Sequence, residues 1–283
     1  MTCQLKSWRT PNPHRPKYPM NPNEPNLAPI VPPTRFFDQL SFIGDENTGC
    51  FLYETGEGLI LIDSLWEDQR SIDIIESGIR ELGHDTEELK AVLVTHGHVD
   101  HYGAAKYLHE TYGAVIYMSE IDYEFSKVPL PFDPSCYYKG GCDHFLGDLD
   151  KLILGGTEIT TVLTPGHTPG CLSLIIPVTD EGRLHNIALW GGTGVTLRTD
   201  VYSYLRSVRR FSRICDEYGV DGEISTHPFV DQSIARYQMI REIPDGVANP
   251  FIIGQDAYHR YEDMFFEMCI DRMQMMEKKK NEK

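Results

Sequence analysis

The chain has 283 residues, of which 41% are hydrophobic and 24% are charged, so it is long enough to bury one large core. Its formal net charge of -16 disfavours nucleic acid and anionic membranes as partners, because basic side chains are not in excess to neutralise phosphate. No apolar run is long enough to span a membrane, and residues 1–8 lack the apolar core of a signal peptide. These features favour a cytoplasmic location.

The first 35 residues contain half of the chain's 18 prolines and are expected to form no regular secondary structure. Two interpretations remain open for this segment. It is either a disordered leader or an arm that packs on the body through Trp8, Tyr18 and Leu27. The large apolar side chains favour the second, so we treat residues 1–35 as a Pro-rich N-terminal arm.

Residues 36–245 carry the hydrophobic patterns of alternating strands and helices. Strands followed by a helix occur in two successive halves, which predicts an α/β fold in which two sheets pack face to face with helices outside, an αββα sandwich. The expected strands are residues 36–44, 50–54, 59–63, 91–95, 114–119, 152–154, 158–163, 171–178, 187–190 and 223–226, and the expected helices are 67–82, 102–112, 202–218 and 232–241.

Residues 246–283 are predicted to add a C-terminal helical extension. Apolar residues recur along it at helical spacing, and they include Tyr258, Tyr261, Phe265 and Met268. Such a stripe either packs on the core or forms a contact between two copies of the chain. Core packing is the first interpretation, and a homodimer through this helix is the second.

The strand 91–95 ends at a segment rich in metal-binding side chains, His96-Gly-His-Val-Asp-His101. In an extended turn, His96 and His98 point to the same side because side chains alternate. Asp100 and His101 follow the turn and can face a second point nearby. Strand ends are where α/β folds place their chemistry, so the segment predicts two neighbouring metal sites.

Three other segments could contribute to such sites. The strand 59–63 ends in a carboxylate, Asp63. A Pro-Gly loop carries His167, and the short strand 223–226 is followed by His227. Each of these residues lies at or just after the end of an expected strand.

Together these motifs resemble the metallo-β-lactamase superfamily, whose signature is His-x-His-x-Asp-His, and the resemblance extends from about Phe36 to about Gln232. It implies the αββα fold of that superfamily. It also implies two zinc ions per chain. The first would be held by His96, His98 and His167, and the second by Asp100, His101 and His227.

The turn that follows the strand 187–190 departs from the common pattern of the superfamily. Most of its hydrolases carry a metal-bridging aspartate there, whereas this chain has Gly-Gly-Thr193-Gly. The third subclass of metallo-β-lactamases has a hydroxyl residue at this place, which Thr193 matches. The segments 37–44 and 48–53 also resemble the opening hairpin of that subclass.

Zinc chemistry is consistent with this ligand set. Three imidazoles leave a tetrahedral zinc ion with one open position for water, whose pKa zinc lowers to about 7. The activated water would be the nucleophile, and Asp100 could orient it or accept its proton. Imidazole ligands without thiolate favour zinc, and iron stays open from the ligands alone. The resemblance disfavours iron, because the diiron relatives carry a bridging aspartate and a glutamate in the first motif, which this chain lacks. Asp63, Thr95 and Thr193 are expected to hold ligands or water by hydrogen bonds.

The segment 120–148 reads as a long loop with many aromatic residues, which is typical of a substrate-binding loop. Whether it covers the site or packs on itself stays open. Residues expected to contact a small-molecule substrate are Phe132, Tyr137, Tyr138, Lys139 and Arg198.

Seven cysteines cannot all pair within one chain, and the cysteines are scattered. Cys136 and Cys142 flank a short turn and could pair under oxidation. We expect free thiols.

Three functions follow from the motifs. The first is zinc-dependent opening of a cyclic amide, as in a β-lactamase. The second is hydrolysis of a lactone or thioester on the same metals, and the third is non-catalytic metal binding. The missing bridging aspartate favours the first over the second, and the full ligand set disfavours the third.

Overall fold

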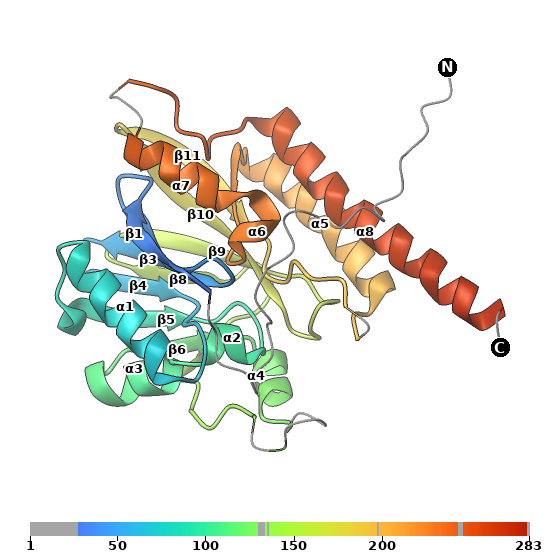
Figure 1. Ribbon diagram of the computed structural model, residues 1–283, viewed down its shortest axis with the longest axis horizontal. Helices are drawn as coiled ribbons and strands as arrows, with labels where there is room; N and C mark the ends of the chain where they lie inside the picture. Colours follow the sequence, from blue (N-terminus) through green and yellow to red (C-terminus); the bar gives the residue numbers. More distant parts are fainter. Residues whose placement is uncertain (1–27, 130–133, 135, 197, 243–245, 282–283) are drawn as a thin grey trace.

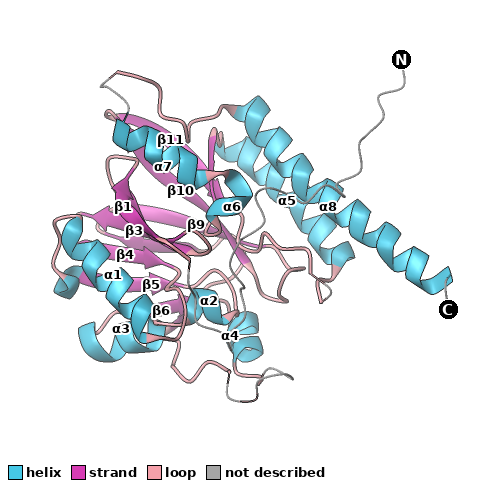
Figure 2. Ribbon diagram, viewed as in Figure 1, coloured by secondary structure: helices cyan, strands magenta, loops and turns pink. Residues whose placement is uncertain are grey.

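The computed structural model describes residues 28–129, 134, 136–196, 198–242 and 246–281 of the chain. Two β-sheets pack face to face, and helices cover both outer faces (Figures 1 and 2). The apolar cluster between the sheets includes Phe42 and Leu93 from one sheet and Leu174 and Leu189 from the other, all fully buried. The αββα sandwich expected from the sequence is therefore confirmed.

The first sheet has seven strands in the order β1-β2-β3-β4-β5-β6-β7. The first four strands pair antiparallel, and the pairs from β4 to β7 are parallel. The carboxyl ends of β4 and β5 therefore lie side by side at one edge of the sheet. The strands are β1 (Ile30–Arg35), β2 (Leu40–Asp45), β3 (Gly49–Thr55), β4 (Gly58–Ile62), β5 (Leu89–Leu93), β6 (Val115–Met118) and β7 (His144–Phe145).

The strand β1 lies within the segment that was expected to form no regular structure, so that expectation is wrong for Ile30–Arg35. This strand contains Pro32 and Pro33, which cannot donate hydrogen bonds to a ladder. It is at the edge of the sheet, and its pairing with β2 is irregular between Val31 and Thr34. An edge position with a bulge is where a sheet tolerates proline. Trp8, Tyr18 and Leu27 lie outside the described residues.

The second sheet has five strands in the order β12-β11-β10-β9-β8, and only the β11–β12 pair is parallel among them. Its longest strand, β10, pairs with β11 over seven positions from Leu174 to Asp180. The strands are β8 (Lys151–Leu154), β9 (Thr157–Leu163), β10 (Leu172–Asp180), β11 (Arg183–Leu189) and β12 (Gly222–Ile224).

Helices α1 and α3 cover the outer face of the first sheet (Figure 1). Asp68 caps the start of α1 by accepting a hydrogen bond from the Ser71 backbone N–H at 2.7 Å, and Ile75 and Ile79 lie buried against the sheet. The helices of this layer are α1 (Gln69–Glu81), the short 3₁₀ helix η1 (Thr86–Glu88), α2 (Val99–Tyr102) and α3 (Ala105–Tyr112).

One helix was expected over residues 102–112, but the structure has α2 and α3 with a break at Gly103. The Gly103 N–H donates to the carbonyl of Leu65 at 2.9 Å. A Cβ atom at Gly103 would lie only 2.0 Å from the backbone carbon of Trp66. The chain that follows β4 thus passes directly against this break and fixes α2 beside the end of β4.

The segment 120–148 is not one long loop. Helix α4 (Glu120–Ser126) follows β6, and β7 closes the edge of the first sheet. Ser119 caps α4 by accepting from the Asp122 backbone N–H at 3.0 Å. The Ser-x-x-Asp spacing is a helix-start signal that the many aromatic and proline residues of this segment obscured.

Helices α5 and α8 cover the outer face of the second sheet and lie side by side (Figures 1 and 2). On α8, Tyr258, Phe265 and Cys269 are buried, and the Phe265 ring stacks on Trp190 at a centroid distance of 5.7 Å. The apolar stripe of α8 therefore packs on its own chain, and a homodimer through this helix stays a prediction. The helices are α5 (Val201–Tyr218), α6 (Pro228–Asp231), α7 (Ser233–Glu242) and α8 (Gln255–Asn281).

Within the described part of the chain, none of the helices combines the length and the apolar character needed to cross a bilayer. Cys136 and Cys142 are both thiols and do not form a disulfide, as expected.

Candidate metal centre

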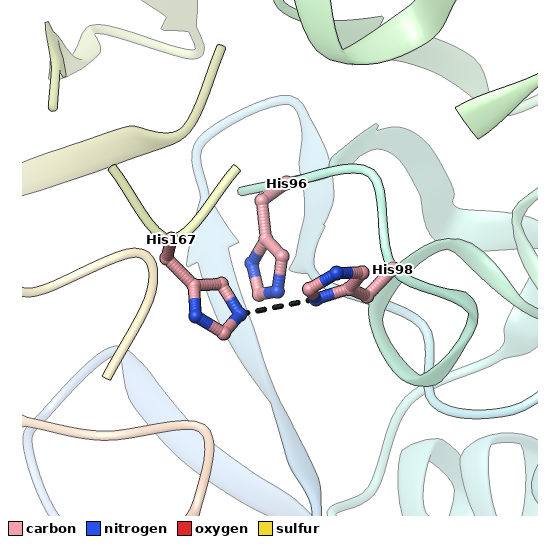
Figure 3. Close-up of side chains that lie close together, drawn as sticks. All are labelled: His96, His98 and His167. Atoms are coloured by element: carbon pink, nitrogen blue, oxygen red, sulfur yellow. Dashed lines mark hydrogen bonds between the residues drawn. The ribbon is translucent and has the colours of Figure 1, made fainter. Parts of the chain in front are cut away.

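Three histidines converge beyond the end of β5, and we call them the first cluster. His96 and His98 follow β5, and His167 lies in the loop between β9 and β10. One ring nitrogen of each residue lies within 4.8 Å of those of the other two (Figure 3). His98 Nδ1 and His167 Nε2 are 3.0 Å apart. Two nitrogens on one tetrahedral zinc ion, with bonds of about 2.0–2.1 Å, are separated by a similar distance.

Asp100, His101 and His227 form the second cluster. Asp100 and His101 lie in α2, and His227 immediately precedes α6. Their ligand atoms also lie within 4.8 Å of one another. Asp100 Oδ2 is 3.6 Å from His101 Nε2 and 3.8 Å from His227 Nε2. The two clusters adjoin, since the ring centroids of His96 and His101 are 3.9 Å apart.

The outer nitrogens of three of these histidines are held by oxygen acceptors. Nδ1 lies 2.7 Å from Asp63 Oδ2 in His101, 2.6 Å from the Gly194 carbonyl in His167, and 2.9 Å from the Asn47 carbonyl in His227. A carbonyl or carboxylate oxygen can only accept, so Nδ1 carries the proton in each ring. The Nε2 lone pair of each ring is thereby directed into its cluster.

Buried nitrogen atoms without partners test whether the clusters fit a metal. Nε2 of His96 and Nε2 of His101 are buried and have no hydrogen-bond partner among the described residues. A buried polar atom normally has a hydrogen-bond partner, because a buried atom without one costs free energy. A metal ion in each cluster would supply the missing partner. Imidazole nitrogens with a single carboxylate are a donor set that suits zinc.

Electrostatics keep the first cluster ready to bind a cation. Burial lowers the pKa of His98 to about 4 and that of His167 to about 3. The pKa of His96 is also well below its ordinary value, because the ring is buried and faces other histidines. All three rings are therefore neutral at pH 7, and no proton has to leave before a metal binds.

In the second cluster, burial and neighbouring charges shift the pKa values of His101 and Asp100 in opposite directions. Burial alone would lower the pKa of His101, but the neighbouring charges of Asp100 and Asp63 raise it overall. Burial would likewise raise the pKa of Asp100, but His101 and His227 lower it overall. Asp100 is therefore an ionised carboxylate at neutral pH, as a metal ligand must be.

Asp63 and Thr95 lie behind the ligands, at the ends of β4 and β5. Asp63 accepts from the Thr95 backbone N–H at 2.7 Å, from the Thr95 hydroxyl at 2.9 Å, and from His101. The Thr95 hydroxyl oxygen is also 3.1 Å from Nδ1 of His96. Through Thr95, the Asp63 carboxylate thus connects His96 of the first cluster with His101 of the second.

The turn after β11 packs tightly against the first cluster. A Cβ atom at Gly192 would lie 2.5 Å from the Cβ atom of His167, and Gly194 supplies the carbonyl that accepts from this ring. Thr193 between them is buried, and its carbonyl accepts from the Tyr204 hydroxyl at 3.2 Å. Thr193 therefore lies in the turn that packs on the first cluster, and its role toward water or substrate stays a prediction.

The expected substrate contacts have different surroundings. Tyr138 is buried against the rings of Tyr102 and Tyr123, and its hydroxyl donates to the Gly141 carbonyl at 3.0 Å, which gives it a packing role. Lys139 forms an ion pair with Glu67 at 3.3 Å and lies over the ring of Tyr137. Arg198 is exposed, and its charge lowers the pKa of His98, so it lies near the first cluster. Phe132 lies outside the described residues.

Several residues that position the ligands were missed from the sequence. Asn47 and Gly194 act through backbone carbonyls, which every residue has, so no sequence signal identifies them. Asp122 binds both loops of the first cluster, although its Ser-x-x-Asp spacing indicates only a helix start. Two aromatic rings also flank the centre, with Phe125 6.0 Å from His98 and Phe229 5.4 Å from His227 between ring centroids.

Comparison with known proteins agrees with this geometry. Residues 43–180 match the model of the metallo-beta-lactamase superfamily. The hydroxyacylglutathione hydrolase GloC of Haemophilus influenzae is 30% identical over 159 residues, which are 51% of this chain and 75% of GloC.

Among solved structures, the native FEZ-1 metallo-beta-lactamase of Legionella gormanii has a TM-score of 0.79 at 22% identity, over 89% of this chain and 99% of FEZ-1. BJP-1, a subclass B3 metallo-beta-lactamase of Bradyrhizobium japonicum, has a TM-score of 0.75 at 25% identity, over 88% of this chain and 95% of BJP-1. The order of the sequence motifs, the fold and the similar proteins all indicate the same family. The chain belongs to the metallo-β-lactamase superfamily and is a metal-dependent hydrolase.

Proposed function

We propose that this protein is a dinuclear zinc hydrolase that opens cyclic amides, as subclass B3 β-lactamases do. The first cluster, His96, His98 and His167, would hold one zinc ion. The second cluster, Asp100, His101 and His227, would hold the other. Support comes from the two adjoining clusters, each with three ligand atoms within 4.8 Å of one another.

The two zinc ions, when bound, supply an activated water of pKa about 7 and polarise the carbonyl under attack. Asp100 would ligate the second zinc and accept the proton that the water loses. Arg198, near the first cluster, would attract the carboxylate that β-lactam antibiotics carry. The half-buried rings that flank the centre, Phe125 and Phe229, would exclude water from the two sides of a bound ring system.

The observation that carries this proposal is the turn after β11. Gly191, Gly192 and Gly194 provide no side chain there, and a Cβ atom at Gly192 would collide with His167. The one side chain between these glycines, Thr193, is a hydroxyl, so the turn offers no bridging carboxylate. The second cluster takes its carboxylate from Asp100 in α2 instead. An all-histidine first site without a bridging aspartate is the pattern that the sequence shares with the third subclass of β-lactamases.

The test is hydrolysis of a chromogenic cephalosporin by the zinc-loaded protein, with and without a chelator. We expect absorbance to change with time and the chelator to abolish the change. A catalytic-site control is the His96→Ala variant, which should be inactive even with zinc in excess. If neither cephalosporin, penicillin nor carbapenem is opened while another acyl substrate is, the proposal is wrong.

A second candidate is hydrolysis of a thioester or lactone at the same centre. The similarity to a hydroxyacylglutathione hydrolase over 75% of that protein's length supports it. The same panel therefore includes hydroxyacylglutathione and an acyl lactone. Turnover of either that exceeds lactam turnover in kcat/KM would make the lactam reaction a side activity.

A further inference from the structure

A single buried carboxylate joins the two loops that supply the first cluster. Asp122, in the first turn of α4, accepts from the Gly97 backbone N–H at 2.8 Å, from the Gly170 backbone N–H at 2.6 Å and from the Thr168 hydroxyl at 2.5 Å. Its side chain is fully buried. Three donors from two separate segments of the chain therefore converge on one side chain that does not reach either cluster itself.

The positions of these donors relate Asp122 to the metal ligands. Gly97 lies between His96 and His98, and Thr168 directly follows His167. A hydrogen bond to the Gly97 N–H fixes the turn from which two ligands project. The bonds to Thr168 and Gly170 fix the loop of the third ligand.

Helix α4 also contacts both loops through its backbone. A Cβ atom at Gly97 would lie 2.7 Å from the Asp122 carbonyl oxygen, and one at Gly170 would lie 2.6 Å from the Asp122 backbone nitrogen. Ser119, which caps α4, donates to the Gly170 carbonyl at 2.6 Å. The helix thus sits between the loops without room for an intervening side chain.

We propose that Asp122 is a positioning residue for the first metal site, which sets the distance of His167 from His96 and His98. The inference rests on the proposed function, because it takes these three histidines as zinc ligands. If the two loops can move relative to each other, a metal ion that binds to ligands from both must first order them, and this weakens its binding. A carboxylate that holds both loops removes this freedom before the metal arrives.

A carboxylate suits this position better than the amide of the same shape. All three of its partners are donors, and a carboxylate accepts through both oxygens. Asparagine would satisfy Gly97 and Thr168 through its oxygen, but its NH₂ group would then face the Gly170 N–H. Asp122→Asn should therefore weaken the hold on the His167 loop by one of its two bonds, whereas Asp122→Ala should release both loops.

The experiment measures zinc affinity rather than turnover. The His227→Ala background removes a ligand of the second cluster, so that metal-free protein can be titrated for the first site in competition with a chromophoric chelator. We compare Asp122→Asn, Asp122→Ala and Thr168→Val in that background. We expect affinity to fall by about 10–100-fold for the two Asp122 variants, with alanine the more affected, and by less for Thr168→Val.

A matched control is Glu262→Gln. Glu262 is also a buried carboxylate, and it accepts from the Ser212 hydroxyl at 2.6 Å between α8 and α5, away from both loops. This variant should lower the melting temperature without weakening zinc binding at the first site. The visible absorption of cobalt(II) in the first site gives a second readout, since its bands report the ligand geometry. The bands should shift in Asp122→Asn and stay unchanged in Glu262→Gln.

The outcomes separate the possibilities. First-site affinity in folded Asp122→Asn equal to that of the background, with unchanged cobalt bands, would overturn the positioning role. If Asp122→Ala does not fold, Thr168→Val still decides, because it removes one of the three bonds with little change of shape. If the protein with an intact Asp122 binds no zinc at the first site, the ligand assignment of the proposed function fails, and this inference fails with it. A weakened first site in a protein that hydrolyses no lactam would leave the inference standing and overturn the proposed substrate alone.

Discussion

Asp63 Oδ2 lies 2.7 Å from Nδ1 of His101, and both side chains are buried. Asp63 adopts a φ of +62°, which is strained for a residue other than glycine. Its carboxylate also accepts two hydrogen bonds from Thr95. The strained backbone thus places one carboxylate where it can orient His101 and hold the end of β5 together.

The first prediction concerns Asp63→Asn. Asparagine tolerates the left-handed backbone, but it cannot accept from Thr95 and His101 through both side-chain atoms. We expect zinc affinity at the second site to fall by about 10–100-fold, because the amide leaves either His101 or the Thr95 backbone N–H without its acceptor and so loosens the end of the site that Asp63 holds. Zinc content after dialysis against a weak chelator measures this. Retention of both ions at wild-type affinity would show that Asp63 only supports the fold.

The second prediction concerns the turn after β11. A Cβ atom at Gly192 would lie 2.5 Å from the Cβ atom of His167, so Gly192→Ala should displace this ring and weaken the first site. The matched control is Gly141→Ala, where a Cβ atom would meet nothing within 4 Å. We expect Gly192→Ala to lose first-site zinc and most of the hydrolytic activity, while Gly141→Ala keeps both. Equal activity in the two variants would contradict the proposed packing.

The third prediction separates the two clusters. His227 is a member of the second cluster only, and its Nδ1 is fixed by the Asn47 carbonyl. His227→Ala should therefore empty mainly the second site. Asp100→Asn should lose a metal ligand and the proton acceptor, so kcat should fall more than substrate affinity. Elemental analysis of zinc and steady-state kinetics check both variants. Loss of both ions in His227→Ala would show that the clusters do not bind metal independently.

The fourth prediction concerns stability and pH. Glu223 in β12 is fully buried, and burial raises its pKa to about 8, with the charge of Asp231 adding to the effect and Arg236 opposing it. The folded protein therefore keeps a proton on Glu223 that the unfolded chain releases near the ordinary glutamate pKa of about 4.3. The stability contributed by this proton is fully present below that pH and is lost as the pH rises through about 8.

Glu223→Gln imitates the protonated form and cannot titrate. The melting temperature of the wild type should therefore fall relative to that of the variant as the pH rises from about 5 to about 8. The control is Glu242→Gln, an exposed glutamate at the end of α7, which should follow the wild type at every pH. Parallel curves for the wild type and Glu223→Gln would mean that Glu223 is ionised in the folded protein.

The sequence alone could predict the αββα sandwich and the six candidate ligands, because both follow from patterns of residues that are close together in the chain. Short apolar runs predicted most strands. The ligands stand within a few residues of strand ends, and strand ends in α/β folds meet at one edge of a sheet. The absence of a carboxylate in the segment 191–194 is also visible in the sequence.

Other features were decided only by tertiary packing. The edge strand β1 is stable despite Pro32 and Pro33 because its pairing with β2 bulges at the sheet edge. The break between α2 and α3 depends on the Leu65–Trp66 backbone, which lies against Gly103. Neither contact follows from the residues adjacent in the sequence.

The residues that orient the ligands likewise could not be predicted from local sequence patterns. Asp122 accepts from Gly97 and Gly170, and His227 donates to the carbonyl of Asn47, across 180 positions of the chain. The partners in these hydrogen bonds come from elements far apart in sequence, and carbonyl or N–H groups are common to nearly every residue. The sequence therefore determines which side chains can bind a metal, whereas the packing of the sheets and α4 determines how they are oriented toward it.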